Sequence, residues 1–198
     1  KHPAGIITKN ALILRDLDLF KALAKDNLVG VNMSITSLSE TTRRVLEPRT
    51  ASIKKRLETV KILSAHNIPV NVMLAPIIPS INSHEILPLA KAASEHGASA
   101  IGHTIVRLNG AVGDIFIDWI NKKMPDRADK VLNQIAACHG GSLNESRFGV
   151  RMRGEGKIAE QINNLVKLAK QKYFSHKVMA HLNCELYESF KTGQLKLF

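Results

Sequence analysis

The stretch VGVNMSITSLSETTRRVLEPRTASIKKRLETVKILSAHNIPVNVMLAPIIPSIN, residues 29–82, decides the fold class. Its first apolar run, 29–36, ends in hydroxyl residues, and its last, 70–75, leads into Pro76. Two strands joined by a long helical crossover lie parallel in one sheet. Their carboxyl ends then share one rim, and ligands of parallel α/β folds bind at that rim.

The same alternation extends to both sides of this stretch. Hydrophobic periodicity and turn residues predict strands at 4–8, 29–36, 70–75 and 100–108. They predict helices at 16–25, 40–46, 53–66, 82–96, 115–123, 128–139 and 158–173. For the helix at 82–96, Asn82 and Glu85 are expected to form a capping box. The chain is therefore predicted to be α/β with a parallel sheet, either a barrel or open.

The chain divides into three parts. A length of 198 residues suits one domain or a large fragment of a bigger one. We expect residues 1–110 to form the sheet and its helices, 111–174 a helical extension, and 175–198 a basic tail. The last five residues, 194–198, could form a short strand or a docked tail. An apolar strand directly after Lys1 leads us to expect that the chain begins inside a domain.

Composition restricts the classes of function. The net charge of +11 favours an anionic partner such as nucleic acid, nucleotide or phosphate, with a solvated basic surface as the alternative. The two cysteines, Cys138 and Cys184, form no metal-binding spacing, and no nucleoside triphosphate motif is present. Isolated thiols indicate a reducing, cytoplasmic setting, and no segment has the apolar length of a membrane span.

Polar residues fall on one face of the predicted strand 29–36. Successive side chains of a strand alternate between faces, so Asn32, Ser34 and Thr36 share one face. The apolar residues between them share the other face, which helices should cover. Buried polar groups are costly unless they hydrogen-bond to one another or to a ligand. The alternative is a polar layer satisfied by neighbouring strands and water, as in barrel interiors.

Basic residues follow two other strands. Lys9 follows the first expected strand, and Arg107 lies near the end of the fourth. Together with Ser34 they would stand on one rim, where a ligand carboxylate could bind, although a lysine at a strand end can also extend into solvent. Glu47 and Arg56 lie in and after the loop above the rim, where a loop-to-helix ion pair is the alternative to a ligand contact.

The segment SRFGVRMRGEG, residues 146–156, is predicted to be a flexible anion-binding loop, and we call it the Arg/Gly loop. Its candidate nucleic-acid-binding or anion-binding residues are Arg147, Arg151 and Arg153. With few acids nearby, these arginines should repel one another in the absence of a partner. A plain surface loop between two helices is the alternative. His103, on the fourth expected strand, is interpreted as a core histidine.

Four segments in order carry a family resemblance. ITK at 7–9, NMSITS at 32–37, LEPRTASIKKR at 46–56 and PVNVMLAPIIP at 69–79 resemble radical S-adenosylmethionine proteins. The nearest branch is spore photoproduct lyase and its relatives, often labelled DNA repair photolyases, and the Arg/Gly loop is similar to an uncharacterised bacterial subgroup. Arg49 stands where the lyase has Gly, so no role transfers to it.

The resemblance implies a partial (β/α)6 TIM-like barrel, of which this chain would hold about strands three to six and the C-terminal helices. It also implies S-adenosylmethionine and a [4Fe–4S] cluster held by a CxxxCxxC motif, which is absent here and would lie upstream. Lys9 and Ser34 would contact the cofactor, and the strand end 75–77 would pack on its adenine. With the rim residues included, the expected cofactor-binding residues are Lys9, Ser34, Thr36, Ala75, Pro76, Ile77 and Arg107.

The expected function is that of a radical enzyme fragment that acts on nucleic acid through a 5′-deoxyadenosyl radical. The full-length protein would be lyase-like and would need an electron donor, whereas this fragment alone should be inactive. The lyase's catalytic cysteine and tyrosines have no counterpart, so cleavage of a thymine lesion is not expected. The alternatives are a nucleic-acid-binding module without catalysis and a non-radical barrel enzyme acting on a phosphorylated metabolite. The sequence leaves substrate and oligomeric state open.

Overall fold

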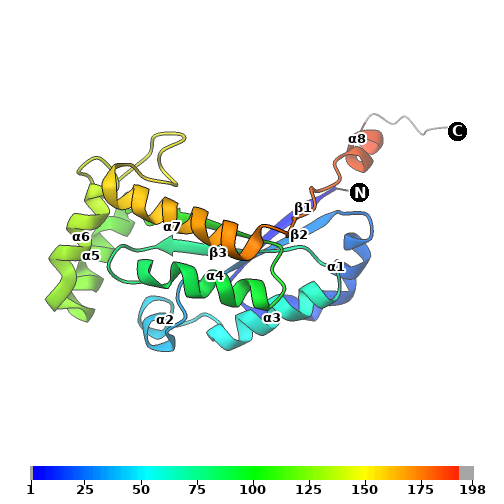
Figure 1. The fold of residues 1–198 in the computed structure, drawn as a ribbon, viewed down its shortest axis with the longest axis horizontal. Coiled ribbons are helices and arrows are strands. Elements are labelled where there is room, and N and C mark those ends of the chain that lie inside the picture. The colour runs from blue at the N-terminus through cyan, green and yellow to red at the C-terminus, as the bar shows by residue number, and fades with distance from the viewer. Residues whose placement is uncertain (1, 192–198) are drawn as a thin grey trace, which may run out of the picture.

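Four parallel strands form one sheet in the computed structural model, which describes residues 2–191 (Figure 1). Their order in the sheet is the order in the chain: β1 Ala4–Thr8, β2 Val29–Ser34, β3 Val70–Ile77 and β4 Ala100–Ile105. Helices connect each strand to the next. The predicted α/β class and parallel sheet are confirmed, and sequential parallel order is consistent with part of a TIM-like barrel.

The helices are α1 Leu17–Ala24, α2 Glu40–Leu46, α3 Ile53–Ala65, α4 Ile86–Glu95, α5 Ala111–Lys123, α6 Ala128–Ala137, α7 Gly156–Phe174 and α8 Glu185–Lys191, with short 3-10 turns at Ala11–Asp16, Ser83–Glu85 and Pro125–Arg127. Helices α1 to α7 fall close to their predicted positions, whereas α8 was not predicted and lies in the segment 175–198 that was expected to be a basic tail. Ser39 and Ser52 cap α2 and α3, because each side-chain oxygen accepts a hydrogen bond from the backbone N–H three residues on.

Several element boundaries differ from the prediction, among them the end of β4, at Ile105 instead of 108, and the start of α4, at Ile86 instead of 82. Strand β2 ends at Ser34, two residues early, and α5 begins at Ala111, four residues before the expected start. Strand β3 does not stop before Pro76 but continues to Ile77. Pro76 has no N–H to donate to the hydrogen bonds between β3 and β4. The register of these two strands accordingly shifts between Leu74 and Ile77, after which Ile77 pairs with Ile105.

The predicted capping box at Asn82 and Glu85 is wrong. The Asn82 side chain instead accepts from the backbone N–H of Ile78 at 2.6 Å and donates to the carbonyl of Thr36 at 2.7 Å. The Glu85 carboxylate accepts from the Ser37 hydroxyl at 3.0 Å. Both side chains thus tie the loop after β3 to the chain beyond β2, which fixes the two strand ends side by side.

The apolar core lies between the sheet and its helices. Val31, Met33 and Ile35 are fully buried there, as the strand alternation predicts. Helices α3, α4 and α7 supply the other side of this core, and α7 packs along α4 (Figure 1). A second apolar cluster, built mainly from α5, α6 and the segment after β4, lies at the carboxyl end of the strands (Figure 1).

The segment after α7 returns to the opposite end of the sheet. Its Asn183 N–H donates to the carbonyl of Asn27 at 2.8 Å, and Met179 lies so close to Gly30 that a Cβ there would come within 3.3 Å of the Met179 methyl carbon. Within residues 2–191, no helix has the length and hydropathy needed to cross a membrane. The strand or docked tail predicted at 194–198 lies outside the described residues.

Candidate functional site

A cleft of about 440 Å³ opens where the four strands end. Of the predicted cofactor-binding residues, Lys9, Thr36, Pro76 and Arg107 line it, each following or ending a different strand of the sheet. Most other lining residues are apolar: Leu46, Ile78, Ile105, Val106, Leu108, Val112, Phe116 and Met152. A mostly apolar cleft with a few polar groups is the usual form of a site for an organic ligand.

Three predicted cofactor-binding residues are not part of the cleft lining. Ser34 is 4% exposed, and its hydroxyl donates to the carbonyl of Ala75 at 3.1 Å. Ile77 is buried in the main core. Ser34 and Ala75 therefore stand behind the cleft wall, where they join the ends of β2 and β3. A ligand contact by Ser34 would require its hydroxyl to give up the bond to Ala75.

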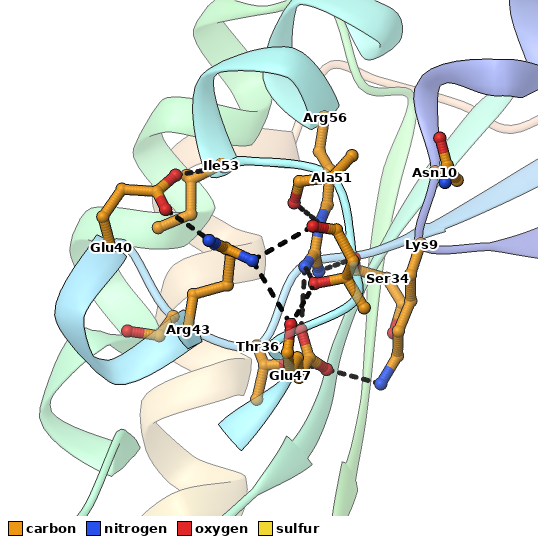
Figure 2. Close-up of polar contacts among 12 residues, drawn as sticks. Lys9, Asn10, Ser34, Thr36, Glu40, Arg43, Glu47, Ala51, Ile53 and Arg56 are labelled. Carbon is orange, nitrogen blue, oxygen red and sulfur yellow. Dashed lines mark hydrogen bonds and ion pairs between the residues drawn. The ribbon is translucent and has the colours of Figure 1, made fainter. Parts of the chain in front are cut away.

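The carboxylate of Glu47 accepts hydrogen bonds from several polar side chains at this wall (Figure 2). One oxygen, Oε1, accepts from Lys9 Nζ at 2.5 Å and from Thr36 Oγ1 at 2.7 Å. The other, Oε2, accepts from the Arg56 guanidinium at 2.9 Å. We call Lys9, Thr36, Glu47 and Arg56 the Glu47 cluster. It links the ends of β1 and β2 to the loop after α2 and to helix α3.

Arg56 is the buried support of this cluster. Its side chain is 1% exposed, and every nitrogen of its guanidinium donates a hydrogen bond (Figure 2). Besides Glu47, the acceptors are the carbonyls of Ala51 and Ser34, each at 2.9 Å, and the hydroxyl of Thr50. Arg56 therefore fastens the loop 47–51 onto the end of β2, and the predicted alternative of a loop-to-helix ion pair is what the structure shows.

The electrostatics of the cluster leave a positive charge at the cleft. Burial raises the pKa of Glu47, but hydrogen bonds from Lys9, Thr36 and Arg56 outweigh that effect, so the pKa lies below its ordinary value. Glu47 is thus ionised and stands between two cations. One positive charge remains uncompensated, and the half-exposed Lys9 side chain carries it to the cleft.

The sequence interpretation missed the contact between Lys9 and Glu47, and it gave the ion pair of Glu47 with Arg56 only as an alternative, although that pair had a signal in the sequence. Its signal was electrostatic: an acid at the C-terminus of α2 and a base in the first turn of α3 each oppose the dipole of their helix. Two residues that are each placed against a helix dipole compensate one another when they pair. The 38-residue separation between Lys9 and Glu47 carried no comparable signal.

The Arg/Gly loop is anchored by ion pairs that the sequence interpretation did not foresee. Arg147 donates to Glu145 and to Glu155, at 2.5 Å each, so the expectation of few acids nearby is wrong for this arginine. The hydrogen bonds from Arg147 lower the pKa of Glu145 to about 2. Arg151 lies over the ring of Phe148, 5.9 Å from its centroid. The loop reaches the cleft through Met152, whose carbonyl accepts from the Ile105 N–H.

His103 faces the helices and not the cleft. Its Nε2 lies 2.7 Å from the side-chain oxygen of Asn163 on α7. Burial lowers the pKa of His103 despite that hydrogen bond, and Lys170 and Arg153 lower it further. A neutral, partly buried histidine packed between sheet and helix is in line with the core role predicted for it.

The described residues do not offer a set of thiolates for an iron–sulfur cluster. Cys138 is buried at the end of α6, and burial raises the pKa of its thiol to about 11. Cys184 is exposed on the segment after α7. Across residues 2–191, no three His, Cys, Asp or Glu side chains come together in a group that could hold a metal ion. A cluster with three cysteine ligands therefore does not fit this part of the protein.

A family model matches the region that builds the cleft wall. The model of the Radical SAM superfamily matches residues 3–93, which run from β1 into α4. This match supports a radical S-adenosylmethionine protein and bears out the family-level resemblance of the motifs. It covers the ends of β1, β2 and β3, which place Lys9, Thr36 and Pro76 at the cleft.

Curated relatives share parts of the chain. An uncharacterized protein of Methanocaldococcus jannaschii is 34% identical over 39% of this chain and 29% of its own length. An uncharacterized protein of Mycobacterium tuberculosis is 26% identical over 63% of this chain and 37% of its own length. One of Acidianus two-tailed virus is 36% identical over 39% of this chain and 26% of its own length. The chain thus spans roughly a third of the length of these relatives.

Proposed function

We propose that this chain is part of a radical S-adenosylmethionine enzyme whose reaction takes place in the cleft and whose substrate is nucleic acid. The observation that carries the proposal is that the matched region, residues 3–93, supplies the ends of three of the four strands at the cleft, including Lys9, Thr36 and Pro76. Family membership at this level implies an enzyme that uses S-adenosylmethionine and a [4Fe–4S] cluster.

In this proposal Lys9, Thr36 and Pro76 hold the cofactor. The Lys9 ammonium has three N–H donors, of which Glu47 takes one, so two remain for a ligand carboxylate. Thr36 presents its hydroxyl beside Lys9, and Pro76 gives an apolar edge on which a flat ring can pack. The apolar lining excludes water from reactive species. When bound and given one electron by the cluster, S-adenosylmethionine would supply the chemistry for hydrogen abstraction from the substrate, and we place the ligands of the cluster outside these 198 residues.

Nucleic acid as substrate is supported by charge. The chain carries a net charge of +11, and Arg151 and Arg153 form no ion pair with any residue in 2–191. Both lie on the loop that reaches the cleft through Met152. Phosphates that bind these arginines would place a strand at the mouth of the cleft. The motifs resemble the DNA repair branch, so a lyase-like reaction on DNA is the specific form of the proposal.

The catalytic part of the proposal is tested on the full-length protein reconstituted with iron and sulfide. We expect the absorbance of a [4Fe–4S] cluster and formation of 5′-deoxyadenosine on reduction. Lys9→Ala should weaken S-adenosylmethionine binding, and Ser34→Ala should do so if its hydroxyl turns toward the ligand. Lys25→Ala, an exposed lysine after α1, is the matched control. A protein with neither the cluster absorbance nor 5′-deoxyadenosine would end the radical interpretation.

The nucleic-acid part is tested by binding as a function of salt. Replacing both Arg151 and Arg153 by Gln should reduce the slope of log K against log salt by about 2. Arg44→Gln removes an exposed arginine on α2 and should leave that slope unchanged if the loop is the contact. If the double variant and the control bind a labelled oligonucleotide equally well at each salt concentration, the loop is not a nucleic-acid contact.

A further inference from the structure

We infer that Arg107 binds an anionic group of the substrate, and that this substrate carries an apolar or aromatic body beside the anion. The inference rests on the proposed function only in taking the cleft as the substrate site. It assigns Arg107 to the substrate and not to the cofactor, and it divides the cleft into a Lys9 end and an Arg107 end.

The charges that line the cleft are not equivalent. Among the described residues, its ionisable lining consists of Lys9, Glu47 and Arg107. Lys9 and Glu47 form an ion pair at 2.5 Å. Arg107 is half-buried and forms no hydrogen bond or ion pair with any other residue between 2 and 191. An arginine in a partly desolvated cleft is stabilised by an oxyanion, which its planar fork can bind with two parallel hydrogen bonds.

Glu47 makes Lys9 less effective than Arg107 at binding an anionic group of the substrate. Its carboxylate is 8% exposed and is held from behind by Arg56, so it does not move away when a ligand arrives. An incoming anion at Lys9 would share that ammonium with the fixed carboxylate of Glu47, so its attraction to Lys9 would be weakened, although Arg56 compensates part of the negative charge. Arg107 has no carboxylate partner in the described structure, so no neighbouring negative charge reduces the attraction between its guanidinium and a bound anion.

The surroundings of Arg107 define the rest of the ligand. Val106 and Leu108 flank it in the chain, and Val112, Phe116 and Met152 line the same cleft. Val112 and Met152 are 56% and 43% exposed, although both are apolar. A small hydrated anion would leave these side chains in water, whereas an anion with an apolar body would cover them. A nucleotide has both parts, a phosphate and a base with two apolar faces.

The test is calorimetric titration of the full-length protein with S-adenosylmethionine at saturation, so that the Lys9 end is filled. The probes are uridine monophosphate, uridine, benzoate and inorganic phosphate. We expect uridine monophosphate to bind, Arg107→Gln to weaken it by about tenfold or more, and Arg107→Lys to weaken it less, since charge remains while the fork is lost. The exposed control Arg127→Gln should change it by less than about threefold.

The outcomes separate the parts of the inference. Equal affinities of Arg107→Gln and Arg127→Gln for uridine monophosphate would overturn the role of Arg107. Binding of inorganic phosphate or of uridine as tight as that of uridine monophosphate would overturn the two-part ligand. Benzoate binding with the same dependence on Arg107 would support the two-part chemistry and identify carboxylates as its source.

A second readout comes from Trp119, the single tryptophan of the 198 residues, whose ring lies 5.3 Å from that of the cleft residue Phe116. Its fluorescence should change on ligand binding, and Trp119→Phe identifies that part of the signal. No binding of uridine monophosphate by a protein that still forms 5′-deoxyadenosine would refute this inference and leave the proposed function standing. Binding of uridine monophosphate that depends on Arg107, in a protein that forms no 5′-deoxyadenosine, would refute the proposed function and leave this inference standing.

Discussion

Two ion-pair clusters in this protein have opposite composition. In the Glu47 cluster one carboxylate lies between two cations, Lys9 and Arg56. In the Arg/Gly loop one guanidinium, that of Arg147, lies between two carboxylates. The central ion pair of the first cluster is buried at the strand ends, with Arg56 1% and Glu47 8% exposed, whereas the central Arg147 of the second is 56% exposed, although its partner Glu145 is 4% exposed. The same kind of contact should therefore contribute global stability in one place and only local order in the other.

Removal of Arg56 should have the largest effect. Arg56→Met fills similar volume but removes the donor to Glu47 Oε2 and to the carbonyls of Ser34 and Ala51, while Lys9 and Thr36 still donate to Oε1. Breaking a buried pair from one side costs about 3–5 kcal/mol, and we expect a loss of that size in urea unfolding. Arg44→Met, at an exposed position on α2, should stay within about 0.5 kcal/mol of the wild type. A loss below about 1 kcal/mol would show that the cluster is not a structural support.

Replacement of Glu47 should have the next largest effect and should depend on pH. Glu47→Gln keeps the size of the side chain but loses charge-assisted hydrogen bonds, at a cost of about 2 kcal/mol at neutral pH. Because the folded pKa of Glu47 is lowered, its contribution is present above the unfolded value near 4.5 and is lost as the pH falls through the folded pKa. The variant should lack this part of the acid dependence. Parallel stability curves for wild type and variant between pH 6 and 3 would contradict this assignment.

Removal of Arg147 should act locally. Arg147→Ala frees Glu145 and Glu155 at the two ends of the Arg/Gly loop. We expect faster amide hydrogen exchange at Glu155 and Ile105, whose N–H groups bond to Cys138 and to Met152 across the loop boundary. The exchange of Val31 and Val72 in the sheet should be unchanged. Faster exchange at all four amides would mean that the loop supports the whole domain, as the Glu47 cluster does.

The two clusters also show where sequence interpretation succeeds and where it stops. Helix α2 begins at Glu40 directly after its cap Ser39, and strand alternation placed Val31 and Met33 in the core, since both signals depend on neighbours in the chain. The hydrogen bond from Lys9 to Glu47 joins residues 38 positions apart, and local periodicity does not encode it. The capping role predicted for Asn82 was wrong for the same reason, because its acceptor, the carbonyl of Thr36, lies 46 residues away on the segment that follows β2.

The smallest expected effect concerns the ionisation of Glu145. Its pKa is held at about 2 by Arg147, so Glu145 should still be ionised at pH 4 in the wild type. In Arg147→Ala the main cause of that shift is gone, so the pKa of Glu145 should rise and a larger fraction of the group should be protonated at pH 4, although the backbone N–H of residue 147 still donates to it. The carboxyl-carbon chemical shift of Glu145 measures this directly at a pH where the core can be checked by circular dichroism. The anchoring of the loop is thus present above about pH 4.5 and is lost as the pH approaches 2. Identical chemical shifts in both proteins at pH 4 would mean that Arg147 does not pair with Glu145 in solution. The Glu47 cluster would then be the one of the two clusters that forms in solution.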